Sequence, residues 1–324
     1  MKAVWYDRQG EARDVLVAGE LPTPQPGQGE VRVRIAVSGV NPGDVKKRQG
    51  WLGSQMPYPR VVPHSDSAGT IDAVGDGVEP ARVGARVWVY GAQSYRPFGT
   101  CAQWTVVPAQ LAVPLPDHVP WDLGASVGIP GITAHRAVFA DGPVAGRTVL
   151  VAGVLGAVGS VAAQLALRGG ARVIGTVRDK AGAAEAAALG VDHVVVLDGD
   201  EVGAIRSIAP NGVDRIVEVA LSANLELDAE VIAQHGVIAA YSSPDPQPRL
   251  PFWPLLFANV SLRLLGSDDF PAEAKRLAAR DLTDAMAEGR LTMPVAHRFP
   301  LDEAAAAHEA VERPRGPGKV LVDV

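Results

Sequence analysis

The chain has 324 residues, a formal net charge of −6 and a single cysteine, Cys101. A chain of this length is too long for one small hydrophobic core, so two domains are expected. The negative charge leaves no basic surface for nucleic acid or anionic membranes. One cysteine excludes an internal disulfide framework and a cysteine-rich zinc site, and the N-terminus has no cationic segment leading into a long apolar one, so a cytoplasmic protein is expected.

The first third of the chain has the pattern of an all-β, barrel-like region. Short apolar or alternating segments are separated by glycine and proline up to about residue 115. This spacing is typical of strands joined by turns. The expected strands are 2–6, 31–37, 68–74, 86–90 and 101–107.

From residue 123 the pattern changes to alternating helices and strands. A helix is expected over 125–138 with an interruption at Pro130-Gly131, followed by strands at 149–151, 173–177, 194–197, 215–219, 237–241 and 261–265 with helices between them. Six strands alternating with helices predict an α/β fold with a doubly wound parallel sheet. A helix over 272–288 precedes two strands, 293–299 and 319–324, which are expected to return to the first domain. The predicted division is 1–123 with 292–324, and 124–291.

A run without charge extends from Val149 to Leu167 and is long enough to suggest a membrane span. Its four glycines, its strand-like start and Gln164 favour a buried strand followed by a buried helix instead. We therefore expect no membrane segment.

The glycines of this run predict a dinucleotide-binding turn. Gly153, Gly156 and Gly159 fall between the predicted strand and the predicted helix. At such a junction glycine permits a tight turn, close approach of a pyrophosphate to the backbone, and close packing of helix on strand. The helix N-terminus then faces the phosphates. The spacing of these glycines differs from Gly-x-Gly-x-x-Gly. The prediction of dinucleotide binding therefore depends on the strand before them and the helix after them.

The end of the next strand favours NADPH over NADH. An acidic residue usually binds the ribose 2′-hydroxyl of NAD there, whereas this chain has Thr176, Val177 and Arg178, followed by Lys180. A guanidinium suits a 2′-phosphate by charge and by its forked donors. The alternative is that Arg178 and Lys180 are solvated residues at a helix start, with Asp179 reducing their field.

Several motifs in order resemble the zinc-free quinone oxidoreductases of the medium-chain dehydrogenase/reductase superfamily, which include zeta-crystallin. They are Gly39-Val40-Asn41-Pro42-Gly43-Asp44, Ser65-Asp66-Ser67-Ala68-Gly69, Gly128-Ile129-Pro130-Gly131-Ile132-Thr133-Ala134, the glycine turn, Gly175-Thr176-Val177, Gly212-Val213-Asp214 and Gly318-Lys319-Val320-Leu321. The resemblance covers essentially the whole chain. It implies a GroES-like catalytic domain built from both chain ends around an inserted Rossmann cofactor domain, and NADPH-dependent reduction of quinones or α,β-unsaturated carbonyls.

The same resemblance implies that no metal is bound. Asn41 stands where related alcohol dehydrogenases have a cysteine ligand, and His64 precedes Ser65 where those relatives have glutamate after their histidine ligand. A barrel histidine is therefore the favoured interpretation of His64. Reduction of a conjugated acceptor does not need the metal that alcohol oxidation uses.

Asn41 is the first candidate for a donor to the cofactor or to the substrate carbonyl. The alternative for Asn41 is a turn residue before Pro42. Asp44 either orients Asn41 or a water molecule, or caps the helix that begins there. Tyr58, in Pro-Tyr-x-Pro, is expected to line the mouth of the site.

Two positions depart from the family. Lys46 and Leu52 stand where tyrosines often face the substrate, which removes two phenol donors. Lys46 is either a cationic donor or a solvated lysine. Trp51 either replaces the lost aromatic surface for a flat acceptor or is structural.

The resemblance also supplies the remaining cofactor contacts. With Asn41, the glycine turn, Thr176, Arg178 and Lys180, the expected cofactor-binding residues are Thr133, Leu155, Ala157, Val158, Val219, Ala220, Asn224, Tyr241, Ser242, Ser243 and Lys319. Leu155 replaces a family serine, and Leu197 replaces a tyrosine that some relatives use near the 2′-phosphate. Arg313 or Arg315 is a candidate substitute for that tyrosine, with an exposed loop as the alternative.

The last predicted strand of the sheet, 261–265, is an edge strand. Relatives pair this edge across a twofold axis, and the apolar segment 252–257 before it offers an interface. A homodimer is expected.

The leading functional hypothesis is a zinc-independent NADPH oxidoreductase for quinones or enones. One alternative is an enoyl or haloacrylate-type reductase of a small unsaturated acid, suggested by Lys46. Another is an NADPH-binding protein without turnover, used structurally or as a redox sensor, suggested by the missing tyrosines. The sequence does not name the physiological acceptor.

Overall fold

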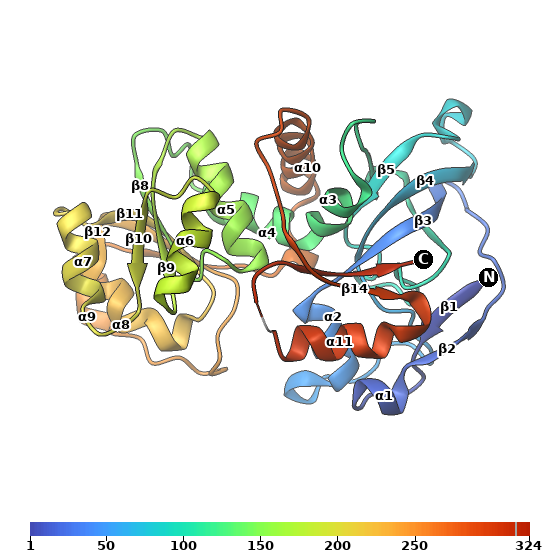
Figure 1. The fold of residues 1–324 in the computed structure, drawn as a ribbon, viewed down its shortest axis with the longest axis horizontal. Helices are drawn as coiled ribbons and strands as arrows, with labels where there is room; N and C mark the ends of the chain where they lie inside the picture. Colours follow the sequence, from blue (N-terminus) through green and yellow to red (C-terminus); the bar gives the residue numbers. More distant parts are fainter. Residues whose placement is uncertain (315) are drawn as a thin grey trace. The chain divides into compact units, whose positions relative to one another are not determined.

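The computed structural model describes residues 1–314 and 316–324 (Figure 1). The chain divides into two compact units. Unit 1 contains Met1–Ile129, Ala279–Ala287 and Met293–Val324, and unit 2 contains Pro130–Ala278 and Glu288–Thr292. Arg315, a candidate for the 2′-phosphate, lies outside the described residues.

Unit 1 is built on a seven-stranded sheet. The strand order is β14 (Val295–Pro300), β15 (Lys319–Asp323), β3 (Glu30–Val40), β4 (Asp66–Val74), β5 (Arg86–Val89) and β7 (Ala112–Pro114), with β6 (Trp104–Pro108) also paired to β3. The C-terminal strand β15 pairs antiparallel with β3, so the two ends of the sequence share this sheet (Figure 1). Alternating residues of β3, including Val31 and Val33, are buried in its core, as the period of a half-buried strand requires. A separate pair joins β1 (Lys2–Trp5) to β2 (Val17–Glu20).

Short helices connect these strands. They are α1 (Ala12–Val15), α2 (Pro42–Gln49), α3 (Trp121–Ser126) and α11 (Ala304–Glu312), with 3-10 turns η1 (Trp51–Gly53), η2 (Pro80–Arg82), η3 (Ala109–Leu111) and η5 (Leu301–Glu303). The sequence analysis missed α11, although four consecutive alanines, 304–307, are strong helix formers.

Unit 2 contains the predicted parallel sheet. The six strands are ordered β10 (His193–Val196), β9 (Arg172–Val177), β8 (Thr148–Val151), β11 (Val213–Glu218), β12 (Ile232–Ala240) and β13 (Ser261–Leu264), and every neighbouring pair is parallel. The strand order reverses between β8 and β11, which is the doubly wound arrangement. The predicted α/β class, with a six-stranded Rossmann sheet and a second β-rich unit, is confirmed.

Helices alternate with the strands of this sheet. They are α4 (Gly128–Phe139), α5 (Ala157–Arg168), α6 (Lys180–Ala188), α7 (Glu201–Ile208), α8 (Leu221–Val231) and α9 (Phe252–Phe257), with the 3-10 turn η4 (Ser267–Asp269). The helix α10 (Ala272–Ala287) follows in the sequence, and its residues 279–287 belong to unit 1. The uncharged run from Val149 to Leu167 is divided between β8 and α5. Within residues 1–314 and 316–324, no helix combines the length and apolar character that crossing a membrane requires.

Some predicted boundaries are wrong for identifiable reasons. The helix interruption falls at Val127, between α3 and α4, and not at Pro130-Gly131. Pro130 lies in the first turn of α4, where the backbone N–H that proline lacks has no helical acceptor. The strand predicted from Cys101 begins at Trp104, because the Cys101 N–H donates to Pro63 (3.1 Å) and the Gln103 N–H to Lys2 (3.0 Å).

Candidate active site

The glycine turn lies between β8 and α5, as predicted. Gly153 has φ of +60°, a conformation that favours glycine, and its N–H donates to Thr176 Oγ1 (3.0 Å). A Cβ on Gly159 would lie 2.5 Å from the Gly153 carbonyl oxygen, which is closer than real Cβ contacts. The turn is therefore built for glycine at its first and third positions.

The backbone at this turn is open at the start of a helix. Gly156 is the N-cap of α5 and is exposed, with φ of −70° and ψ of 160°. The N–H groups of the first helical turn, at Ala157, Val158 and Gly159, have no acceptor within the helix. Such a terminus attracts anions through its free N–H groups and its dipole. Leu155 is half-buried, and its Cδ1 points toward Gly182, so it contributes packing rather than a donor.

Two exposed cations follow the end of β9, with Asp179 between them. Arg178 and Lys180 are exposed. The carboxylate of Asp179 caps α6, where Oδ1 accepts the Gly182 N–H (2.9 Å). Leu197 lies beside this strand end, because its N–H donates to the Val177 carbonyl (2.9 Å). In unit 1, Arg313 is exposed directly after α11.

The loop after β11 lies against the glycine turn. A Cβ on Gly153 would be 3.3 Å from Val219 Cγ1, which places the two loops together where the strand order reverses. Ala220 is half-buried and donates its N–H to Glu218. The Asn224 amide donates to both carboxylate oxygens of Glu218 (3.0 and 3.2 Å). The sequence analysis missed Glu218, whose signal is a carboxylate at the end of a buried strand.

A pocket of about 330 Å³ lies at the ends of β12 and β13. Three predicted cofactor residues, Tyr241, Ser242 and Ser243, line it together with Leu221, Ala240, Leu264, Leu265 and Gly266. Burial, and then the charge of Glu218, raise the pKa of Tyr241. Thr133, on α4, is buried.

In unit 1, Asn41 lies in a buried cluster with Asp66 and Lys319. Asn41 Nδ2 donates to Asp66 Oδ2 (2.7 Å), and Lys319 Nζ donates to Asn41 Oδ1. Asp66 Oδ1 also accepts the Ile129 N–H (2.9 Å). The ammonium of Lys319, predicted as a cofactor contact, is therefore engaged by the amide and the carboxylate. The sequence analysis quoted Asp66 only as part of a motif.

Asp44 performs the capping role that the sequence allowed. It lies at the third position of α2, and its Oδ2 accepts the Asn41 N–H (2.8 Å). Burial, and then the charge of Asp66, raise its pKa to about 7. The Asp44 carboxyl is consequently harder to ionise than an exposed aspartate.

Lys46 and Trp51 contact one another. Lys46 Nζ lies 4.2 Å from the centre of the Trp51 ring, a cation–π geometry, and Trp51 is exposed. Burial lowers the pKa of Lys46. Leu52 is exposed with φ of +55°. Tyr58 donates its hydroxyl to the Tyr95 carbonyl (2.5 Å), so this phenol is already engaged.

His64 is fully buried and uses both ring nitrogens within the protein. Nδ1 lies 2.9 Å from Ser38 Oγ and Nε2 lies 3.0 Å from Nε2 of His308. Arg48 donates to His308 Nδ1 (3.4 Å). Because arginine only donates, His308 carries its proton on Nε2 and His64 carries its proton on Nδ1. Burial, and then the charge of Lys319, lower the pKa of His64 to about 3, which agrees with a neutral ring.

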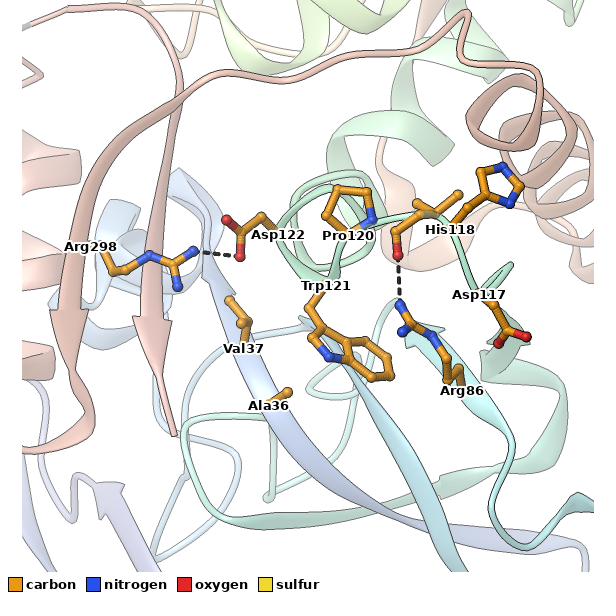
Figure 2. A pocket seen from close by; sticks show the side chains of 10 residues that line it. Ala36, Val37, Arg86, Asp117, His118, Pro120, Trp121, Asp122 and Arg298 are labelled. Atoms are coloured by element: carbon orange, nitrogen blue, oxygen red, sulfur yellow. Dashed lines mark hydrogen bonds and ion pairs between the residues drawn. The ribbon is translucent and has the colours of Figure 1, made fainter.

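A second pocket, of about 420 Å³, lies on unit 1 and contains none of the predicted site residues (Figure 2). The charged side chains that line this pocket make ion pairs and hydrogen bonds within the protein. Figure 2 shows Arg298 paired with Asp122. Arg86 donates to the Val119 carbonyl (2.6 Å). The Arg86 guanidinium also stacks 3.8 Å from the ring centre of Trp121. Within the described ranges, no group of three or more His, Cys, Asp or Glu has a geometry that would hold a metal ion.

Comparisons with known proteins agree with this architecture. The model of the alcohol dehydrogenase GroES-like domain matches residues 27–117, and that of a zinc-binding dehydrogenase matches residues 189–322. A quinone oxidoreductase of Rattus norvegicus is 29% identical over 330 residues, which cover 99% of this chain and 97% of that protein. A mycobacterial protein solved in complex with NADPH is 29% identical with a TM-score of 0.87, and an NAD-dependent alcohol dehydrogenase is 28% identical with a TM-score of 0.88. Each of these two alignments covers 100% of both chains.

A doubly wound parallel sheet with a glycine turn, together with a GroES-like β-rich unit, defines the dehydrogenase/reductase class of oxidoreductases. Over its whole length the chain is similar to quinone oxidoreductases of the medium-chain dehydrogenase/reductase superfamily.

The buried carboxyl of Asp228, on α8, gives a testable pH dependence. Burial, and then the charge of Glu218, raise its pKa from 3.8 to about 9. Between these values the folded protein holds a proton that the unfolded chain releases, so this group makes the protein less stable as pH rises. Asp228→Asn should therefore increase the free energy of unfolding by about 3 kcal/mol more at pH 8 than at pH 6, at 1.36 kcal/mol for each pH unit. Urea unfolding at both pH values measures this difference.

Glu226→Gln is the matched control for this prediction, because Glu226 is exposed on the same helix. It should change the unfolding free energy equally at both pH values. An equal effect of Asp228→Asn at pH 6 and pH 8 would contradict the prediction.

Proposed function

We propose that the protein is an NADPH-dependent, zinc-independent oxidoreductase that reduces quinones or α,β-unsaturated carbonyls by hydride transfer. The observation that carries this proposal is the glycine turn at the reversal of the strand order, followed by Arg178 at the end of β9. The similarity to quinone oxidoreductases and to a protein solved with NADPH supports it.

The residues of unit 2 fit a dinucleotide. The close approach of Gly159 to Gly153 and the exposed Gly156 leave room for a pyrophosphate against the α5 N-terminus. Arg178 and Lys180 bind the 2′-phosphate, because both are exposed cations at the end of β9 and the guanidinium offers paired donors to phosphate oxygens. The remaining contacts come from Thr133, Leu155, Ala157, Val158, Thr176, Val219, Ala220, Asn224, Tyr241, Ser242, Ser243 and Asn41. The Lys319 ammonium is engaged by Asn41 and Asp66 and acts through the Asn41 amide. When bound, the nicotinamide supplies the hydride.

The two domains have different roles in the proposed reaction. Residues 1–123 and 292–324 form the catalytic domain, and residues 124–291 form the nucleotide-binding domain. In the catalytic domain, Asn41 donates a hydrogen bond to the acceptor oxygen and Asp44 holds the Asn41 backbone. Trp51 offers a flat surface, and Tyr58 packs near the mouth of the site.

Zinc independence follows from the donors available near Asn41. An amide is a poor substitute for the thiolate of a catalytic zinc site. Both nitrogens of His64 are engaged by Ser38 and His308, so this histidine is not free to coordinate a metal. Cys101 is buried, and burial together with the charge of Asp44 raises the pKa of its thiol.

A reductase of small unsaturated acids is the second candidate. The observation that favours it is the partly buried ammonium of Lys46, which lies over an exposed ring and is able to meet a carboxylate. Lys46→Ala should remove a preference for acids under this alternative, and should leave it unchanged if quinones or enones are the substrates.

The protein forms a homodimer in the cytoplasm. The edge strand β13 and the preceding helix α9 expose apolar side chains, with Leu264 70% and Phe257 68% exposed. A parallel sheet edge with an apolar surface is usually paired or covered. A single buried cysteine suits a reducing compartment.

Activity tests the proposed reaction directly. NADPH consumption at 340 nm is measured after treatment with EDTA, with 1,4-benzoquinone, a naphthoquinone, an enone and a small unsaturated acid, and with NADH in parallel. Rapid oxidation of NADPH by quinone or enone despite the chelator is expected, because no step requires a metal. Turnover with the acid alone would select the second candidate, and binding without turnover would indicate a non-catalytic protein.

Arg178→Ala tests the assignment of the 2′-phosphate. Loss of the guanidinium should raise the Kd for NADPH about tenfold and leave the Kd for NADH unchanged, because only NADPH carries that phosphate. Arg172→Ala is the control, since Arg172 is exposed at the other end of the same strand. Fluorescence titration gives both constants. An equal rise in the Kd values for NADPH and NADH would mean that Arg178 does not bind the 2′-phosphate.

Light scattering tests the dimer. At micromolar concentration the measured mass should be twice the 33.8 kDa of the chain. Leu264→Lys should shift the protein to the monomer, because a charge would be buried at the paired edge. Leu277→Lys, at an exposed leucine of α10, should leave the dimer intact. A wild-type monomer would refute the interface.

A further inference from the structure

The side chain of Asn41 is held from both ends by charged partners. Asp66 Oδ2 accepts from its nitrogen at 2.7 Å, and the Lys319 ammonium donates to its oxygen. Lys319 is 2% and Asp66 0% exposed, and Lys319 Nζ lies 3.7 Å from Asp66 Oδ2. All three residues belong to unit 1.

These partners fix which way the amide points. An ammonium group only donates and a carboxylate only accepts, so the atom facing Lys319 is the oxygen and the atom facing Asp66 is the nitrogen. In the flipped orientation the amide N–H groups would face the Lys319 ammonium and the amide oxygen would face the Asp66 carboxylate, and both contacts would be repulsive. Asp66 uses one of the two N–H groups on Nδ2. The second N–H therefore points in a defined direction as a donor.

Asp44 fixes the main chain at the start of α2. Asn41 is the N-cap of this helix, and Asp44 Oδ2 accepts the Asn41 backbone N–H at 2.8 Å. The side-chain amide of Asn41 faces the two charged groups, Asp66 and Lys319.

Burying the charges of Lys319 and Asp66 costs free energy, and their hydrogen bonds to the Asn41 amide offset part of that cost. Burial lowers the pKa of Lys319 and raises that of Asp66, and each charge partly offsets the shift of the other. An ion pair at 3.7 Å alone is a weak reason to bury a lysine. Both groups instead complete their contacts through Asn41.

We propose that Lys319 and Asp66 are positioning residues that lock the Asn41 amide so that its remaining N–H is the donor to the carbonyl oxygen of the acceptor. This rests on the proposed function. A fixed, desolvated donor stabilises negative charge on that oxygen without rearranging as the charge develops. We call this fixed arrangement of Asn41, Asp66 and Lys319 the lock. It favours acceptors whose oxygen accepts a hydrogen bond, and it affects kcat rather than the Kd for NADPH.

NMR signals of the Asn41 side-chain amide report on its orientation in the absence of any reaction. The chain has only four asparagines, at 41, 211, 224 and 259, so selective ¹⁵N labelling gives four amide pairs, and loss of one pair in Asn41→Asp assigns Asn41. In the presence of NADP⁺, which donates no hydride, cyclohex-2-enone should shift one N–H of the Asn41 pair. Lys319→Met should alter the Asn41 pair in the free protein and abolish the shift caused by the enone.

Kinetics supply the second readout. Lys319→Met should lower kcat about tenfold or more while the Kd for NADPH changes less than twofold, since the donor is misdirected and the nucleotide is not. Lys275→Met is the matched control, because Lys275 Nζ donates to the Asp268 carbonyl (2.7 Å) and should leave kcat and the Asn41 signals unchanged. If Lys319→Met does not fold, the double variant D66N/K319M, which removes both buried charges, carries the same expectation.

The outcomes separate the lock from the proposed function. Unchanged Asn41 signals together with unchanged kcat in Lys319→Met would overturn the lock. A tenfold loss of NADPH affinity in that variant would also overturn it, in favour of a direct nucleotide contact by Lys319. Absence of turnover in the wild type would refute the reductase, whereas the amide signals of the free protein would still test the lock.

Discussion

The buried carboxylate of Asp66 is the constraint around which the segments near Asn41 in unit 1 are organised. It accepts from Asn41 at the start of α2 and from the Ile129 N–H, and it faces Lys319 on β15. Gly128 has no side chain, and a Cβ there would collide with the Asp66 carboxylate. A buried charge requires such partners. Four segments distant in sequence are therefore fixed to one another by one side chain at the start of β4.

The two functions assigned to the chain depend on different kinds of group. The proposed nucleotide site is made mainly of backbone N–H groups and glycines, so a change such as Leu155 in place of a family serine leaves its main donors intact. The proposed acceptor site depends on side chains, and Lys46 and Leu52 replace two family tyrosines there. In that proposed site Lys46 lies over the ring of Trp51.

The sequence predicted the architecture well because the pattern is local. The period of apolar residues located all six parallel strands, and the glycines located the turn between β8 and α5. The partners of the site residues were not predictable in the same way. Asp66 and Lys319 meet Asn41 across 25 and 278 positions, and Glu218 binds Asn224 from the preceding strand. Such contacts depend on the packing of strands and helices, which no local spacing encodes. The helix interruption was misplaced because proline is tolerated in a first turn.

Transfer of deuterium tests the central claim most directly. NADPH carrying deuterium at C4 of the nicotinamide is incubated with cyclohex-2-enone and EDTA-treated protein, and the saturated ketone is analysed by mass spectrometry and NMR. Direct hydride transfer predicts one deuterium at the β-carbon of the product from one C4 epimer of the nucleotide only. A product without deuterium, or no product with any acceptor while NADPH still binds, would contradict the assignment of this protein as a hydride-transferring reductase.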